Sequence, residues 1–302
     1  MTEQATRIAI VGLGNMGAPM AQRWISAGFE MHGFDTAQAA RDRFAEVGGT
    51  AHDSASAAVS AADVVVFMLP SSAVVDSVLD GLLESGALRD GMLVIDMGSS
   101  QPLHSIANRD RLAAIGVDFI DAPVSGGVRG VIAGTLAIMV GGNSELVRRA
   151  EPLLSVLGNV THVGETGAGH AAKALNNLVS AAHLWMTSEA VLVAKRFGIE
   201  PQAMVDLLNA STGRSVSSEV KWPKFILTES YDSGFQAALL SKDALVATEL
   251  TASLGLPPLL GEGVAQLWSR LAADLPAGAD HTEVARWIDE HYDQTARKPG
   301  AP

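Results

Sequence analysis

The chain of 302 residues contains no cysteine. This absence excludes disulfide bonds, thiolate metal ligands and cysteine nucleophiles, and it suits a reducing compartment, so we expect a cytoplasmic protein. Long hydrophobic runs are missing too, because stretches such as 61–70 and 93–97 are far shorter than the roughly 20 residues that cross a bilayer. Residues 1–6 are polar and lack the pattern of a signal peptide. We therefore expect neither a membrane span nor a secretory leader.

Positive charge is also scarce. Lysine and arginine number 21 against 33 aspartates and glutamates, which gives a formal net charge of −12. This balance opposes general attraction to nucleic acid or to a membrane surface, and we expect neither as a partner. The histidines lack the spacing of a metal-binding set and no H-x-x-x-H pair occurs, so we expect no metal site.

The first half of the chain, from Arg7 to about Gly142, alternates short β-branched runs with alanine-rich stretches. This alternation predicts an α/β fold with a doubly wound parallel sheet. The predicted strands are Arg7–Val11, Glu30–Asp35, Val64–Leu69, Leu93–Asp96, Asp118–Asp121 and Leu136–Val140. Because these runs are apolar on both faces, we expect helices on both sides of the sheet.

A glycine-rich turn with G-x-G-x-x-G spacing directly follows the first predicted strand and precedes a helical stretch over 18–27. The turn consists of Gly12, Leu13, Gly14, Asn15, Met16 and Gly17. In a Rossmann fold the first glycine permits the tight turn, the second lets the backbone approach a pyrophosphate, and the third lets helix pack on strand. The context therefore predicts a dinucleotide site rather than a glycine turn without a ligand.

Asp35 stands at the end of the second predicted strand, where a carboxylate accepts hydrogen bonds from the adenosine ribose. A carboxylate there repels the 2′-phosphate of NADP, so NAD is favoured as the cofactor. Arg41 and Arg43 leave NADP open as the alternative.

After Gly164 the sequence is helical, with no convincing strand. A nearly continuous helix is predicted over 169–197, longer than typical globular helices, and we interpret it as a link between two domains. Further helices are predicted over 201–209, 234–254, 259–273 and 282–292, and a polar tail over 294–302 is expected to fray. We thus predict a Rossmann domain over 1–164, an interdomain helix over 165–197 and an all-helical C-terminal domain over 198–302.

Four segments, in order along most of the chain, resemble the β-hydroxyacid dehydrogenase family. Val11–Ala21 resembles its version of the dinucleotide fingerprint. Asp121–Gly127, continuing to Gly130 and Gly134–Leu136, is similar to its substrate-binding loop. Gly167–Asn177 resembles its catalytic segment, and Lys242–Asp243 its late cofactor-contacting pair.

The resemblance implies a catalytic site between the two domains, NAD or NADP as cofactor, and a homodimer or homotetramer. It implies a general acid/base at Lys173, an orienting amide at Asn177, and a substrate-carboxylate site that consists of Ser125, Gly126 and Gly127. The remaining implied contacts are those along the cofactor, from Met68, Leu69, Pro70, Ser99 and Lys242, and a substrate-side loop that contains Arg214. Ser99 stands where the family commonly has threonine.

The residue spacing in the catalytic segment is also informative if the segment is a helix. Gly169, Lys173 and Asn177 are spaced four apart, so they form one stripe, and we expect the glycine to leave open space above the lysine. A lysine with a pKa of about 10.4 is a poor base at neutral pH unless burial or cations such as Lys242 or Arg214 lower that pKa. His170 is expected at a surface or a subunit interface.

The fingerprint and the resemblance together lead us to expect an NAD(P)-dependent dehydrogenase. It would interconvert a small β-hydroxy acid similar to 3-hydroxyisobutyrate and the corresponding semialdehyde, with hydride passing to the nicotinamide and Lys173 handling the proton. One alternative is a reductase of tartronate semialdehyde or sulfolactaldehyde. A second, from another class, is a dinucleotide-binding scaffold without catalysis.

Overall fold

Strand β1 (Arg7–Val11) lies inside a sheet with hydrophobic clusters on both faces. Ile8 and Ile10 pack into one cluster, and Ala9 and Val11 pack into the other. Successive side chains of a strand point to opposite faces, so a strand that is apolar throughout needs cover on both sides. The predicted interior sheet is confirmed.

The computed structural model describes residues 6–257 and 259–296, and the chain divides into two compact units, Met1–Lys173 and Ala174–Pro302. We call them unit 1 and unit 2. Within the described residues, no helix combines the length and the apolar character that crossing a membrane requires. The division into three parts over 1–164, 165–197 and 198–302 stays a prediction.

The sheet of unit 1 has the order β3-β2-β1-β4-β5-β6-β8-β7, with β9 paired to β8. The first six strands in this order are mutually parallel, whereas β8 runs antiparallel to β6 and β7. After β1, the strands are β2 (Glu30–Phe34), β3 (Thr50–Ala51), β4 (Val64–Phe67), β5 (Leu93–Asp96), β6 (Asp118–Asp121), β7 (Val124–Ser125), β8 (Leu136–Gly141) and β9 (Gly158–Gly164). This is the predicted doubly wound Rossmann arrangement.

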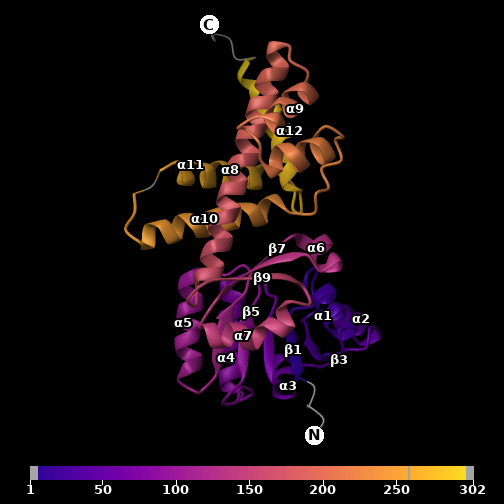
Figure 1. Cartoon of the computed structure of the whole chain (residues 1–302), viewed down its shortest axis with the longest axis vertical. Helices are drawn as coiled ribbons and strands as arrows, with labels where there is room; N and C mark the ends of the chain where they lie inside the picture. Colours follow the sequence, from indigo (N-terminus) through magenta and orange to yellow (C-terminus); the bar gives the residue numbers. More distant parts are fainter. Residues whose placement is uncertain (1–5, 258, 297–302) are drawn as a thin grey trace. The chain divides into compact units, whose positions relative to one another are not determined.

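Seven helices of unit 1 flank this sheet (Figure 1). One face is covered by α1 (Gly17–Ser26), α2 (Gln38–Glu46), α6 (Gly127–Ala133) and α7 (Ser144–Leu154). The other face is covered by α3 (Ala55–Ser60), α4 (Ser72–Glu84) and α5 (Pro102–Ala113). On the first face the indole N–H of Trp24 donates to the Leu153 carbonyl at 2.9 Å, so even the largest core side chain has its polar atom satisfied.

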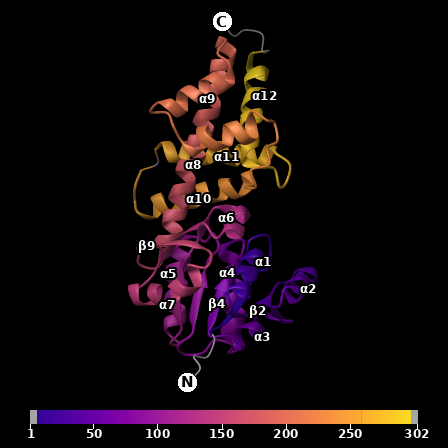
Figure 2. The same cartoon turned by 45° about the vertical axis from the view of Figure 1, so that its right-hand side comes forward.

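Unit 2 is built from helices, as predicted (Figure 2). They are α8 (Ala168–Phe197), which begins in unit 1, then α9 (Pro201–Ala210), η1 (Ser217–Ile226), α10 (Ala237–Ser253), α11 (Leu260–Asp274), η2 (His281–Glu283) and α12 (Val284–Ala296). The ring of Trp185 lies 5.9 Å from that of Trp268 and 5.6 Å from that of Trp287, both edge to face. Aromatic packing therefore forms the centre of this core.

Several short elements differ from the predictions. Strands β3 and β7 have two residues each and were not predicted. Strand β9 was missed because it is largely exposed and carries few apolar residues. The π-helix η1 was not predicted either, and it contains Pro223. The predicted frayed tail lies outside the described residues except for 294–296, which end α12.

Candidate active site

The loops that follow β1, β4 and β5 touch one another at the carboxyl edge of the sheet in unit 1. A Cβ atom on Gly12, whose φ is +103°, would lie 2.3 Å from the Met68 carbonyl oxygen, and a Cβ on Gly98 would lie 2.8 Å from that of Leu69. These approaches are possible only for glycine. They place the predicted cofactor residues Met68, Leu69 and Pro70 beside the glycine-rich turn and beside the loop with Ser99.

The three glycines of the turn differ in what surrounds them. A Cβ on Gly17 would lie 1.9 Å from the Gly12 carbonyl oxygen, because α1 packs directly on the turn. Gly14 has no atom within 4 Å of its Cβ position, so its backbone faces open space. In the first turn of α1, the Ala18 N–H donates to the Gly14 carbonyl at 3.1 Å and Pro19 has no N–H, so the donors for a pyrophosphate would come from the glycine-rich turn itself. The turn fits a dinucleotide.

Asp35 follows β2 and closes the turn from the other side. Its Oδ2 accepts the Leu13 backbone N–H at 2.7 Å and its Oδ1 accepts that of Ala37 at 2.8 Å. A carboxylate has about four lone-pair positions, so acceptor sites remain for ribose hydroxyls. Arg41 lies close by, because its guanidinium donates to the Asp35 backbone carbonyl at 2.6 Å.

Ser99 lies in a loop shaped by the buried carboxylate of Asp96. The Oδ1 of Asp96 accepts the Gly98 backbone N–H at 2.9 Å, and its Oδ2 accepts the Ser100 hydroxyl at 2.6 Å. Ser99 itself is half-buried.

Strand β7 ends in the predicted carboxylate-binding turn. Ser125 pairs with Ala137 of β8, and Gly126 and Gly127 follow with φ values of +129° and +61°. Both glycines are exposed, and a Cβ on Gly127 would meet nothing within 4 Å. Exposed glycines with positive φ occur in turns that offer backbone N–H groups to an anion.

Lys173 lies against the start of this turn. Its Nζ donates to the Val124 carbonyl at 2.7 Å, and its side chain is half-buried on the second turn of α8. Unit 1 therefore places Lys173 beside the start of the Ser125–Gly127 turn.

Two details of the catalytic segment correct the sequence-based interpretation. A Cβ on Gly169 would lie 2.4 Å from the Met139 carbonyl oxygen and 2.8 Å from Asp121 Oδ2, so this glycine permits close packing on the sheet and leaves no open space above the lysine. His170 is 1% exposed rather than at a surface, because the first turn of α8 lies directly on the strand ends.

Asp121, which begins the loop motif of the sequence analysis but was given no role there, holds that first turn. Its Oδ1 accepts the Gly167 backbone N–H and its Oδ2 that of His170, both at 2.7 Å. Burial raises the pKa of Asp121, while the nearby imidazole of His170 and the two backbone donors lower it. An aspartate at the end of a buried strand was the available signal.

Unit 2 holds a second group of predicted residues. The Nδ2 of Asn177 donates to Asp243 Oδ2 at 2.7 Å, and the Lys242 ammonium lies 3.6 Å from Asp243 Oδ1. Asp243 is buried and fixes the orientation of the Asn177 amide. The sequence analysis named Lys242–Asp243 as a pair but assigned no role to the carboxylate.

Arg214 forms an ion pair at the surface of unit 2. It is exposed, and its Nε is 2.6 Å from Glu219 Oε1 at the start of η1. In the described part of the chain, no group of three or more metal-ligating side chains is placed to hold an ion.

The fold and the glycine-rich turn define the chain as an oxidoreductase that uses a nicotinamide dinucleotide. Residues 7–164 match the family model for the NAD binding domain of 6-phosphogluconate dehydrogenase. Residues 167–288 match the model for the NAD-binding region of NADP-dependent 3-hydroxyisobutyrate dehydrogenase.

Individual relatives agree with these models. A probable 3-hydroxyisobutyrate dehydrogenase of Mycobacterium bovis is 37% identical over 281 residues, or 89% of this chain and 93% of the relative. The NAD-dependent L-serine dehydrogenase of Pseudomonas aeruginosa is 35% identical, over 94% of this chain and 98% of the relative. The solved structure of Mycobacterium tuberculosis 3-hydroxyisobutyrate dehydrogenase with L-serine has a TM-score of 0.89 at 35% identity, over 94% of this chain and 99% of that one. The chain belongs to the β-hydroxyacid dehydrogenase family, and it is an NAD(P)-dependent dehydrogenase.

Proposed function

We propose that Lys173 is the general acid/base in the oxidation of a small β-hydroxy acid, or in the reverse reduction. The observation that carries this proposal is the 2.7 Å hydrogen bond from Lys173 Nζ to the Val124 carbonyl. It holds the amine beside the turn of Ser125, Gly126 and Gly127, which we propose as the site of the substrate carboxylate. A hydroxyl group one carbon beyond the α-carbon of a bound acid would then lie near the amine.

In the oxidative direction, the neutral Lys173 amine takes the hydroxyl proton while the hydride leaves the same carbon for the nicotinamide, and a carbonyl forms. In the reductive direction, the ammonium returns the proton to the carbonyl oxygen. Asn177 lies one helical turn beyond Lys173 on α8, and we propose that its amide orients the substrate oxygen. Its bond to Asp243 removes a rotational freedom that would otherwise be lost on substrate binding.

We propose NAD as the preferred dinucleotide. The Asp35 carboxylate at the end of β2 favours ribose hydroxyls and repels a 2′-phosphate. Arg41 donates to the backbone carbonyls of Asp35 and Thr36, and these bonds hold its guanidinium away from the role of a phosphate ligand. Met68, Leu69, Pro70, Ser99 and Lys242 are proposed contacts along the cofactor, and Arg214 a contact on the substrate side.

The substrate class follows from the relatives. L-serine and 3-hydroxyisobutyrate, named for two of them, share a carboxylate and a β-hydroxyl group and differ at the α-carbon. We propose an acid of the 3-hydroxyisobutyrate type. Reduction of tartronate semialdehyde or sulfolactaldehyde is the alternative that the same chemistry permits.

A panel assay tests this proposal. Purified protein with NAD or NADP would be offered 3-hydroxyisobutyrate, 3-hydroxypropionate, glycerate, serine, threonate and a sulfonated C3 diol, and reduced nicotinamide would be followed by absorbance. The two semialdehydes would be offered with the reduced cofactors. We expect turnover with at least one acid. Dinucleotide binding without turnover on any compound would favour the scaffold without catalysis.

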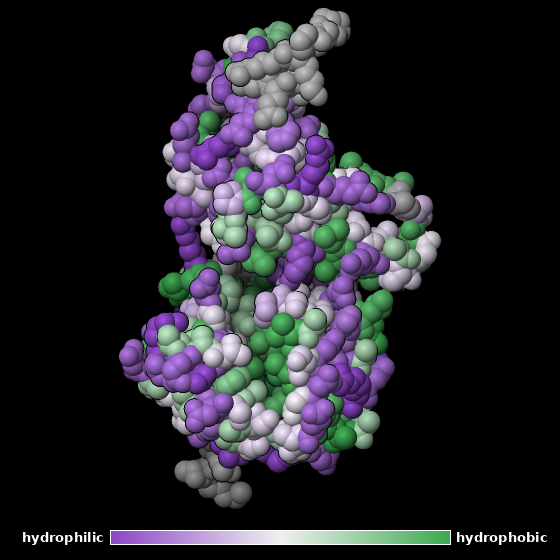
Figure 3. All heavy atoms as spheres, turned by 180° about the vertical axis from the view of Figure 1, so that it is seen from behind, coloured by the Kyte–Doolittle hydropathy of each residue, from purple (hydrophilic) through white to green (hydrophobic). Residues whose placement is uncertain are grey.

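We also propose that the protein is a homodimer or homotetramer. On α8, Val179, Met186 and Val193 recur every seven residues and are 54%, 58% and 55% exposed. Further exposed leucines lie where α10 and α11 are joined, and Figure 3 shows hydrophobic residues at this end of unit 2. Exposed apolar faces of this kind are typical of subunit interfaces.

Sedimentation velocity tests the subunit count. We expect an oligomer that Met186→Glu weakens, because a charge would be buried in the interface. Ser180→Glu, at an exposed position of α8 that is rotated by about 100° from Val179 around the helix, is the control. A stable monomer at micromolar concentration would exclude this proposal.

We also propose a cytoplasmic location. The absence of cysteine supports it, and microscopy of a tagged protein would test it.

A further inference from the structure

Two buried carboxylates lie side by side at the carboxyl edge of the sheet in unit 1. Asp96 ends β5 and Asp121 ends β6, and the two residues are register partners on neighbouring parallel strands. Asp96 is 1% exposed and Asp121 is fully buried. Two adjacent carboxylates without water repel each other, so the site needs a group that compensates them.

Each carboxylate shapes a different functional segment. Asp96 accepts hydrogen bonds from Gly98 and Ser100 and so fixes the loop on either side of Ser99. Asp121 accepts the backbone N–H groups of residues 167 and 170 and so fixes the first turn of α8. Lys173 lies on the next turn of that helix.

His170 lies between the two carboxylates. Its Nδ1 is 2.8 Å from the Ser105 hydroxyl and 3.6 Å from Asp121 Oδ2, and its Nε2 is 3.9 Å from Asp96 Oδ2. The Nε2 atom has no hydrogen-bond partner among the described residues. With the single proton of the Ser105 hydroxyl on the 2.8 Å contact to Nδ1 rather than on the 3.4 Å contact to the Gln101 carbonyl, the ring carries its own proton on Nε2, directed at Asp96. The imidazole is also the group that lowers the pKa of Asp121 most, against the increase caused by burial.

We propose that His170 is a positioning residue for the dehydrogenase reaction. Its imidazole bridges Asp96 and Asp121 and thereby holds the Ser99 loop and the Lys173-bearing turn of α8 in one fixed arrangement. This inference rests on the proposed function, in which the Ser99 loop contacts the cofactor and Lys173 transfers the proton.

The position of the two ring nitrogens makes the proposal specific. A glutamine side chain reaches as far as Nε2, so its amide replaces the atom that faces Asp96. An asparagine side chain reaches only to Nδ1, so it keeps the Ser105 contact and loses the one to Asp96. The pair His170→Gln and His170→Asn therefore separates bridging from simple filling of the site, and His183→Asn, an exposed histidine on the same helix, is the control.

Steady-state kinetics give the first readout. In His170→Asn we expect kcat to fall roughly 10- to 100-fold, because small displacements of reacting groups cost this much. The KM for the dinucleotide should change far less than kcat, because the glycine-rich turn is unaffected and only the Ser99 loop among the proposed cofactor contacts is displaced. His170→Gln should restore most of kcat, and His183→Asn should resemble the wild type. Equal losses in the Gln and Asn variants, or no loss in either, would overturn the proposal.

Hydrogen exchange of the backbone amides at positions 167 and 170 gives a second readout that needs neither cofactor nor substrate. We expect faster exchange in His170→Asn and near-normal exchange in His170→Gln. This result would support the bridging role even if the wild type turned over no substrate, an outcome that would count against the proposed function alone. Faster exchange with unchanged kcat would overturn the positioning role.

Should His170→Asn not fold, Ser105→Ala takes its place. It removes the hydroxyl that holds Nδ1 and leaves the ring present. A smaller loss of kcat with faster exchange at residues 167 and 170 is then expected, and normal values of both would overturn the proposal.

Discussion

Strand β6 begins and ends on an aspartate, and the two carboxylates have different environments. Asp118, at the amino end, has a side chain that is 40% exposed and lies 3.0 Å from the guanidinium of Arg149. Asp121, at the carboxyl end, is fully buried and accepts two backbone N–H groups of α8. The ion pair of Asp118 can be replaced by contacts with water at little cost in stability. Removing the Asp121 carboxylate would leave two buried backbone N–H groups without acceptors.

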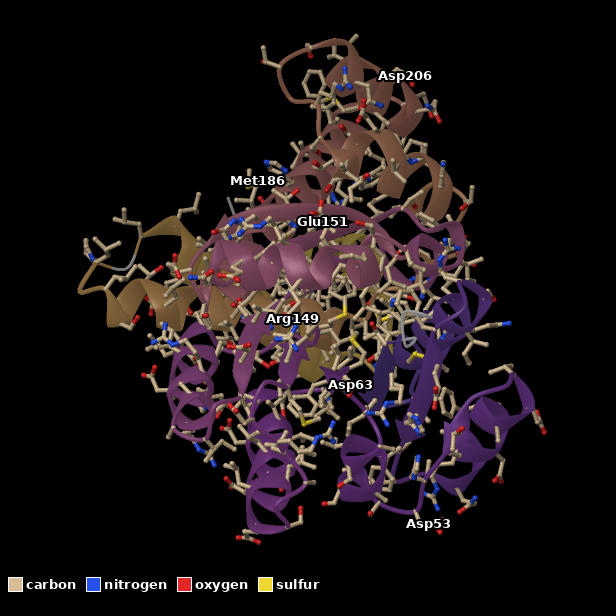
Figure 4. All side chains as sticks on the ribbon, turned by 60° about the horizontal axis from the view of Figure 1, so that its bottom comes forward. Asp53, Asp63, Arg149, Glu151, Met186 and Asp206 are labelled. Atoms are coloured by element: carbon tan, nitrogen blue, oxygen red, sulfur yellow. The ribbon has the colours of Figure 1, made fainter. Side chains whose placement is uncertain are left out.

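The same contrast holds along both edges of the sheet. At the amino edge, Asp63 pairs with Arg7 at 2.8 Å and Arg89 at 3.3 Å, and the three side chains are partly exposed, Arg7 by 35%, Asp63 by 43% and Arg89 by 44%. Figure 4, which brings the bottom of Figure 1 forward, shows Asp63 and Arg149 at this end of unit 1. At the carboxyl edge the polar groups are buried and shape loops. The comparison teaches that the costly polar contacts lie where an open α/β fold binds its ligands.

The largest effect is expected at Lys173. Lys173→Ala should lower kcat by roughly 100- to 10,000-fold, the range that general acid/base groups contribute, with little change in dinucleotide affinity. Lys195→Ala removes an exposed lysine of the same helix that pairs with Asp289, and it should leave kcat unchanged. Parallel measurement of kcat and dinucleotide binding checks both. Similar kcat values in the two variants would remove Lys173 from the mechanism.

Two glycines of the turn should respond differently to substitution, one in the stability of the protein and the other in dinucleotide binding. Gly17→Ala forces a Cβ against the Gly12 carbonyl and should lower the free energy of unfolding by roughly 1–3 kcal/mol. Gly14→Ala meets no protein atom, so its stability should be normal while dinucleotide affinity falls about tenfold. Chemical denaturation and calorimetric titration measure the two quantities. Normal dinucleotide binding by Gly14→Ala would show that the open space is not the phosphate site.

The aspartates of β6 test the comparison itself. Asp121→Asn should lower the free energy of unfolding by roughly 1–3 kcal/mol, because the amide cannot accept both backbone donors. Asp118→Asn should cost at most about 1 kcal/mol, as exposed ion pairs do. Denaturation at neutral pH compares them, and equal losses would break the contrast between the two edges.

The free energy of unfolding should also depend on pH in opposite directions for a buried and a partly exposed aspartate. Burial raises the folded-state pKa of Asp121, so the native state holds this proton more tightly than the unfolded chain does. Its contribution to stability is therefore largest below the ordinary carboxyl range and falls as the pH rises through the raised pKa. For Asp63, hydrogen bonds from Arg7 lower the pKa, so the contribution is present above the ordinary range and is lost as the pH falls. Asp121→Asn and Asp63→Asn should thus remove slopes of opposite sign.

The smallest effect concerns the cofactor. Asp35→Asn removes the charge at the end of β2, and with it the repulsion of a 2′-phosphate, so the ratio of kcat/KM for NAD over NADP should shift toward NADP by about tenfold. Asp42→Asn, on the exposed side of α2, is the matched control and should leave the ratio unchanged. An unchanged ratio in Asp35→Asn would mean that another group selects the dinucleotide.

The sequence was informative wherever a pattern is local. Six strands, the α8 helix and the fingerprint turn follow from hydrophobic periodicity and glycine spacing, and the structure has them nearly where predicted. Strand β9 was not predicted because an exposed strand at the edge of a sheet lacks a pattern of apolar residues. The burial of His170 was not predicted for another reason. It depends on Asp121, which is distant in the sequence and comes close to His170 only in the folded chain. Contacts between residues far apart in sequence have no local signature.

The most direct test of the central claim is hydride transfer itself. The best acid from the panel would be prepared with deuterium on the carbon that bears the hydroxyl, and the reduced dinucleotide would be recovered and examined by NMR. We predict deuterium on the nicotinamide ring with the wild type, and no detectable transfer in the same time with Lys173→Ala. A reduced dinucleotide without deuterium, or transfer at the wild-type rate in Lys173→Ala, would contradict the account.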